Sequence, residues 1–81
     1  MNLYLLTQET HVSYDTYDSV VVAAETEEQA IDTRPDGQDW AVEKGFWNGW
    51  AFLREQVTVK LIGVAAEGIE AGVVIASFNA G

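Results

Sequence analysis

Four short apolar runs constrain the fold of this sequence more than any other feature. Residues 3–6 are Leu-Tyr-Leu-Leu, residues 19–24 are Ser-Val-Val-Val-Ala-Ala, and residues 73–78 are Val-Val-Ile-Ala-Ser-Phe. At the start of residues 57–64, valine and leucine alternate with threonine and lysine. Runs of this length that are rich in β-branched and aromatic residues are typical of strands. The sequence therefore predicts a sheet of four strands.

The segments within and between these runs suggest how the strands are placed. The uninterrupted run at residues 19–24 indicates a strand that is covered on both faces, whereas the alternation in residues 57–64 indicates one partly solvated face. Residues 67–72, which are rich in glycine and charge, form a loop that is too short for the crossover of a parallel pair. We therefore expect the last two strands to be neighbours that pair antiparallel.

One segment carries the signals of a helix start. Thr26 is followed three residues later by Gln29, which makes a capping box, and two glutamates lie in the first turn, where the helix dipole favours negative charge. The helix should span residues 27–33, because Pro35 disfavours helical backbone at the residue before it. Ala30 is expected to face the core.

The middle of the chain is rich in aromatic residues. Five of the nine aromatic side chains lie between Trp40 and Phe52, where Gly45 and Gly49 oppose a stable helix. We expect an irregular or weakly helical segment whose tryptophans pack on the sheet. The predicted fold is a single α+β domain over residues 1–81: a four-stranded, mainly antiparallel sheet with one main helix in the order β-β-α-β-β.

Length and composition exclude several classes of protein. A chain of 81 residues holds one small domain. Without cysteine it can form neither a disulfide scaffold nor a thiolate zinc site. There is neither a leader-like segment nor an apolar stretch of about 18 residues, so we expect a soluble, cytoplasmic protein.

The residues that catalysis requires are sparse. His11 is the one histidine, so a two-histidine metal site cannot form, and no serine lies in a nucleophile elbow. The glycines match neither a phosphate-binding loop nor a dinucleotide fingerprint. The closely spaced aspartates in residues 15–18 and 36–39 lack the ligand pattern of a calcium loop. We therefore expect no enzyme activity, catalytic residue, metal or cofactor.

Charge is the unusual property of this chain. Thirteen Asp and Glu residues against four Lys and Arg give a net charge of −9. Ten of the thirteen acids lie at or before Glu43, where Arg34 is the one cation, and the remaining half is neutral. This distribution excludes binding to nucleic acid by phosphate neutralisation and disfavours an anionic membrane. A basic partner remains, as does an acidic surface that serves solubility alone.

The acidic half approaches the linear charge density of duplex DNA, which carries one charge per roughly 1.7 Å of axis. Carboxylates at this density are attracted to grooves that bind nucleic acid. We expect partner binding through residues that act as phosphate surrogates: Glu9, Asp15, Asp18, Glu25, Glu27, Glu28, Asp32, Asp36 and Asp39.

Both ends of the sequence resemble a family of small phage and prophage proteins. The resemblance lies in LYLLTQ at residues 3–8, YDTYDS at residues 14–19 and SFNAG at residues 77–81. It implies an origin in a mobile element and transfers no activity and no site residue. Small acidic phage proteins are often inhibitors of host defence, including anti-CRISPR proteins, which is an analogy of size, charge and origin.

Together these observations predict a phage-encoded, non-enzymatic inhibitor in the host cytoplasm. Its partner is expected to be a basic surface of a host protein complex, such as a CRISPR effector, with no direct contact to nucleic acid or membrane. The alternative is a phage accessory or structural module that self-associates, for instance as a homodimer, through its aromatic patch or a sheet edge.

Overall fold

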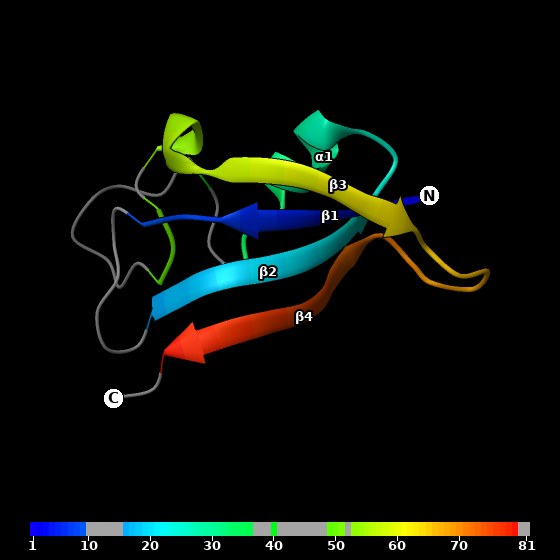
Figure 1. Ribbon diagram of the computed structural model, residues 1–81. Coiled ribbons are helices and arrows are strands. Elements are labelled where there is room, and N and C mark those ends of the chain that lie inside the picture. Colours follow the sequence, from blue (N-terminus) through cyan, green and yellow to red (C-terminus); the bar gives the residue numbers. More distant parts are fainter. Residues whose placement is uncertain (10–15, 37–39, 41–48, 52, 80–81) are drawn as a thin grey trace.

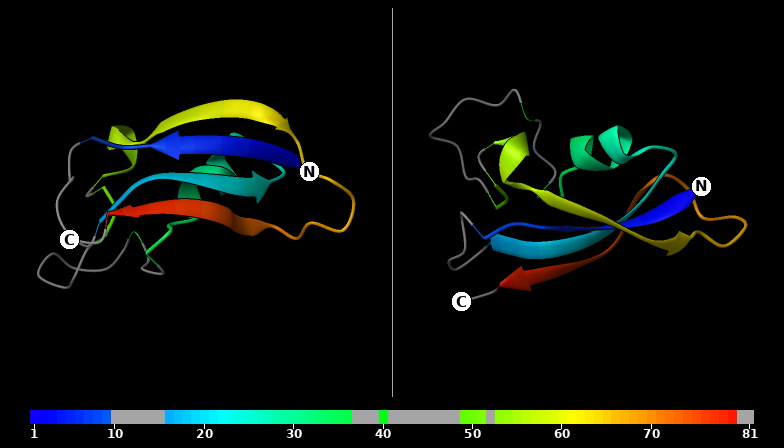
Figure 2. Two further views of the ribbon diagram at one scale, coloured as in Figure 1. Left: turned by 60° about the horizontal axis from the view of Figure 1, so that its bottom comes forward. Right: turned by 45° about the horizontal axis from the view of Figure 1, so that its top comes forward.

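Strands dominate the described part of the chain. The structure is a computed structural model that describes residues 1–9, 16–36, 40, 49–51 and 53–79. These residues form one sheet and two short helices, in the order β1 (Asn2–Thr7), β2 (Thr16–Ala24), α1 (Glu27–Asp32), the 3-10 helix η1 (Arg54–Gln56), β3 (Thr58–Val64) and β4 (Gly72–Asn79). The sheet lies as one twisted layer with both helices on the same side (Figures 1 and 2).

The strand order across the sheet is β3-β1-β2-β4, and every neighbouring pair is antiparallel. The expected pairing of the last two strands is therefore wrong, because β3 and β4 form opposite edges. The connection between them spans residues 65–71. Seven residues reach up to about 23 Å, which exceeds the roughly 14 Å of three strand spacings. A short loop therefore passes the end of the sheet and leaves the apolar strands β1 and β2 at its centre.

The core lies on one face of the sheet. Alternate residues of β1 and β2 point toward α1, among them Leu6, Val20 and Val22, all at most 1% exposed. Trp50 and Ala30 complete the packing, and both are fully buried. The single α+β domain with a tryptophan on the sheet is thus confirmed, as is the inward position of Ala30. Trp47 lies outside the described residues.

The opposite face of the sheet differs from the sequence-based expectation. The β-branched run in β2 was expected to be covered on both sides, but Val21 is only half-buried and no described element packs over it. Ile75, its partner on β4, is 66% exposed. Ala23, on the same face of β2, is fully buried, so the expectation fails at Val21 and holds at Ala23. It fails at Val21 because the described helices α1 and η1 lie on the other side of the sheet (Figure 2, right).

The helix begins as its capping signals predict. The Thr26 hydroxyl accepts a hydrogen bond from the Gln29 amide (3.1 Å), and the Gln29 side chain accepts one from the Glu25 amide (2.7 Å). The helix ends at Asp32, and the Thr33 amide donates to the Ala30 carbonyl. Across the described residues, no helix is long and apolar enough to span a bilayer.

Candidate functional site

The start of α1 presents a group of carboxylates to solvent. Glu25, Glu27 and Glu28 are all exposed. The capping hydrogen bonds around Thr26 hold their backbone in place, and the helix dipole favours acids in its first turn. Among the described cations, none forms an ion pair with these three side chains. They therefore remain available to a positively charged partner.

The fold brings two further carboxylates to the same end of the molecule. The β3–β4 connection, which contains Glu67 and Glu70, lies at the end of the sheet where β2 leads into α1 (Figures 1 and 2). The backbone amide of Ala65 donates to the Met1 carbonyl at 2.9 Å, which ties this connection to the start of β1. Glu67 and Glu70 are exposed. We call the five exposed residues of this region the acidic end: Glu25, Glu27, Glu28, Glu67 and Glu70.

Sequence reasoning did not find the contribution of the β3–β4 connection. Glu67 and Glu70 belong to the half of the chain that is neutral overall, so they were not counted among the expected partner-binding residues. The signal that would have placed them is the strand order, which puts β3 and β4 on opposite edges. The net charge of a sequence segment therefore does not reveal which carboxylates lie close together in the folded protein.

Two of the expected partner-binding residues lie at the opposite end of the sheet. Thr7 pairs with Ser19 where β1 ends, and the exposed Glu9 and Asp18 lie beside this pair. The amide of Gln8 donates to the Asp18 carbonyl at 3.2 Å, which holds these segments together. The predicted acidic half is therefore divided between two ends of a molecule whose longest dimension is 38 Å.

Asp32, at the last turn of α1, is partly neutralised. Its carboxylate forms an ion pair with Arg54 of η1, and both side chains are about half-exposed (54% and 53%). The Arg54 guanidinium also lies 5.8 Å from the centre of the Trp40 ring. Exposed pairs of this kind contribute little to stability. The pair nevertheless lowers the charge that Asp32 presents to a partner.

Asp36 requires a correction, because its side chain is fully buried and cannot act as a surface phosphate surrogate. It forms a bidentate ion pair with Arg34, in which Arg34 Nε and Nη2 lie 3.0 Å and 2.7 Å from the two carboxylate oxygens. The amide of Gly49 donates to the same carboxylate at 3.1 Å. The Arg34 guanidinium lies 4.5 Å from the centre of the Trp40 ring. These contacts give Asp36 a structural role.

The same cluster joins three segments that are distant in the sequence. Trp40 Nε1 donates to the Ile31 carbonyl of α1 at 2.9 Å, and the Gly49 carbonyl accepts from the Tyr17 amide of β2 at 2.6 Å. The segment around Asp36 is therefore held between the helix and the sheet. This tertiary arrangement removes the Asp36 carboxylate from the surface.

The remaining expected residues, Asp15 and Asp39, lie outside the described residues, as does His11. Within the described part of the chain, no group of three or more histidine, aspartate or glutamate side chains could hold a metal ion. The exposed carboxylates of the described residues gather at the two ends of the sheet, and the acidic end holds the larger group.

The chain matches no protein-family model, no curated protein and no solved structure. Fold and site together describe a small antiparallel sheet protein with one covered face, one open face and an acidic end.

Proposed function

We propose that the protein is a stoichiometric, non-enzymatic inhibitor of phage origin, which binds the basic nucleic-acid-binding surface of a host complex such as a CRISPR effector. The observation that supports this proposal is the exposure of Glu25, Glu27 and Glu28 on a capped helix without a described cation as partner. Glu67 and Glu70 extend the same surface. These carboxylates take the place of the phosphates that the partner normally binds.

Long-range attraction is the main physical consequence of this arrangement. A cluster of like charges raises the rate at which an oppositely charged surface is encountered, and salt screens the effect over a Debye length of about 8 Å at physiological ionic strength. Many weak charge contacts act together in such a complex, so no single carboxylate should be decisive. Asp36 is excluded from this surface by its burial, and Asp32 contributes less because of Arg54.

The proposal is tested by competition. A panel of purified CRISPR effector complexes is incubated with fluorescent duplex DNA, and the protein is added at increasing concentration and at several salt concentrations. We expect DNA to be displaced from at least one complex, with an apparent affinity that falls steeply as salt rises. The absence of displacement across the panel, or displacement that ignores salt, would contradict the proposal.

A neutralised variant locates the surface. Glu25→Gln, Glu27→Gln and Glu28→Gln together remove three negative charges and preserve the cap formed by Thr26 and Gln29. We expect this variant to associate more slowly and with a weaker salt dependence. Glu9→Gln, Asp18→Asn and Glu55→Gln together remove three exposed carboxylates that lie outside the acidic end, and this matched control should weaken binding less.

The alternative function, an accessory module that self-associates, is favoured by a separate observation. Several large apolar side chains are exposed along the edge strands, among them Val74 (48%) and Ile75 (66%) of β4. Exposed apolar groups of this kind mark contact surfaces when they are contiguous. Val74 and Ile75 lie within β4 and not at the acidic end, so the two functions are compatible.

A further inference from the structure

The face of the sheet that points away from α1 is composed of three parallel rows of side chains. Strand pairing aligns one residue from each strand in every row, and paired residues point to the same face. The first row contains only hydroxyls: Thr58, Thr7, Ser19 and Ser77. The second contains Lys60, Leu5, Val21 and Ile75. The third contains Gly63, Leu3, Ala23 and Gly72. We call these three rows the open face.

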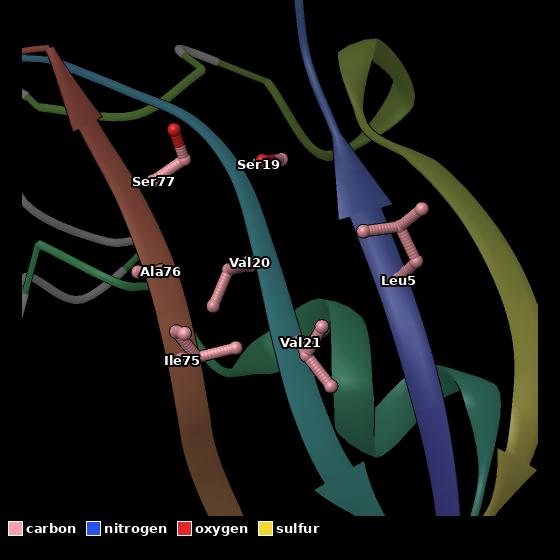
Figure 3. Close-up of a pocket in the computed structure, with 7 residues that line it drawn as sticks. All are labelled: Leu5, Ser19, Val20, Val21, Ile75, Ala76 and Ser77. Carbon is pink, nitrogen blue, oxygen red and sulfur yellow. The ribbon is translucent and has the colours of Figure 1, made fainter.

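The open face is apolar at its centre, and its rows differ in the size of their side chains. Leu5, Val21 and Ile75 stand beside one another on three adjacent strands and line a shallow depression with the Ser19 and Ser77 pair, while α1 lies behind the sheet (Figure 3). The third row is low, because only Leu3 in it has a large side chain. Bulky and low rows on one surface allow side chains of a facing surface to interlock.

Charge indicates what kind of partner this face accepts. The three rows contain no carboxylate, and their one ionisable side chain is the exposed Lys60. Glu9 and Asp18 border the first row at its Thr7–Ser19 pair, and the Asp18 carboxylate accepts a hydrogen bond from the Ser19 hydroxyl at 3.4 Å. Beyond this border a basic partner gains no charge attraction on the open face, and the five carboxylates of the acidic end attract it more strongly. The second and third rows, which lie away from this border, are the part of the surface through which two copies of an acidic chain can approach each other.

We infer that the open face binds the open face of a second copy, so that two sheets stack into a sandwich. In this arrangement the helices α1 of the two copies lie on the outer sides of the dimer. Stacked sheets lie about 10 Å apart, and the acidic first turns of α1 lie beyond both of them. Their separation exceeds the Debye length of about 8 Å, so the repulsion between the two first turns is largely screened.

The size of the open face sets the strength of the contact. Four strands about 4.8 Å apart and three alternate rows along them cover about 20 Å by 20 Å, or roughly 400 Å² of projected area per copy. An interface of this size is smaller than that of most permanent dimers and lies in the range of weak, reversible complexes. We therefore expect a dimer with a micromolar or weaker dissociation constant that exchanges with the monomer.

This inference does not depend on the proposed basic partner, and salt separates the two. Screening weakens the repulsion between two acidic chains, so self-association should strengthen as salt rises. Binding to a basic partner should weaken over the same range. If the protein dimerises but displaces no DNA, the dimer is supported and the proposed function is contradicted. If it displaces DNA but stays monomeric, the proposed function is supported and the dimer is contradicted.

Lysine substitutions provide the test. Val21→Lys places a charge in the second row on the central strand β2, and Ile75→Lys places one in the same row on the edge strand β4. Leu61→Lys is the control, because Leu61 pairs with Tyr4 and points toward the covered face. Each change lowers the net negative charge, which by itself favours association. We expect both open-face variants to weaken dimerisation at least about tenfold, because lysine would be buried without a partner, and Leu61→Lys to leave it unchanged.

Sedimentation velocity over a concentration series measures the association, and circular dichroism checks that each variant folds. A native protein that stays monomeric up to millimolar concentration overturns the inference, as does an equal loss with Leu61→Lys. Loss with Ile75→Lys alone indicates pairing through the β4 edge and also overturns it.

A distance measurement tests the geometry without altering the apolar row. The chain has no cysteine, so single variants Ser77→Cys and Glu28→Cys can each carry one spin label. The label at Ser77 lies on the open face and the label at Glu28 on α1, so the distance between copies should be shorter for Ser77→Cys. A shorter distance for Glu28→Cys overturns face-to-face stacking.

Discussion

Leu5 and Leu6 are adjacent residues of one strand, and they illustrate how differently the two faces of the sheet are used. Leu6 points toward α1 and is fully buried, whereas Leu5 points to the open face and is only half-buried. Val22 and Val21 differ in the same way on β2. Side chains of the same type therefore contribute to the core on one face and to a contact surface on the other.

The two faces differ because the chain has too few residues outside the sheet to cover both of them. A domain of this length buries only about 60% of its unfolded surface, and within the described residues the two short helices lie on a single side (Figure 2). The side chains of one face are buried under the helices, and the other face is left uncovered and apolar at its centre. Exposed apolar side chains that are contiguous mark contact surfaces, and Leu5, Val21 and Ile75 are adjacent on three strands of the open face.

The largest expected effect comes from removing the main side chain of the covered face. Trp50 is fully buried within the core cluster. Trp50→Ala should lower the free energy of unfolding by about 3–5 kcal/mol, which approaches the whole stability of a small domain. Urea denaturation followed by circular dichroism measures it. Leu53→Ala, at a side chain that is 52% exposed, is the control and should cost little; equal losses would contradict the assignment of the core.

The adjacent leucines give a sharper comparison. Leu6→Ala should destabilise the protein by about 3 kcal/mol, because it leaves a cavity under α1. Leu5→Ala removes the same atoms from a half-buried position and should cost about 1 kcal/mol in the monomer. Thermal unfolding at low protein concentration, where a dimer is absent, measures both. Equal costs would show that the two faces are equally important for folding.

The smallest of these effects concerns the helix that closes the covered face. Thr26→Ala removes the hydroxyl that accepts the Gln29 amide and should cost about 1 kcal/mol. Thr26→Ser retains the hydroxyl and serves as the control, with native stability expected. Hydrogen exchange at the Gln29 amide reports the loss locally, and an unchanged exchange rate in Thr26→Ala would contradict the capping role.

Local signals account for much of what could be predicted. The strands follow from β-branched and aromatic runs, and the helix start follows from Thr26 and Gln29 within a few residues of each other. Trp50 could be assigned to the core because a small chain has few larger apolar groups to bury. These properties depend on neighbours in the sequence or on composition, and both are visible without a structure.

The errors involve relations between distant segments. The pairing of β3 with β4 was inferred from a short connection, but β1 pairs with both β2 and β3 and so separates the edge strands. Asp36 was counted among exposed carboxylates, because nothing near it in the sequence reveals the Gly49 amide and the Trp40 ring that surround its ion pair.

The sequence by itself determined the strands, the capped helix and the net charge of −9, because each depends on residue type and short-range spacing. Only the tertiary structure decided which charges and apolar residues share a surface. Strand order brought Glu67 and Glu70 to the end where α1 begins, burial removed Asp36 from the surface, and the position of one short helix left Leu5, Val21 and Ile75 uncovered. Surface composition depends on packing between segments far apart in the chain, which local pattern does not specify.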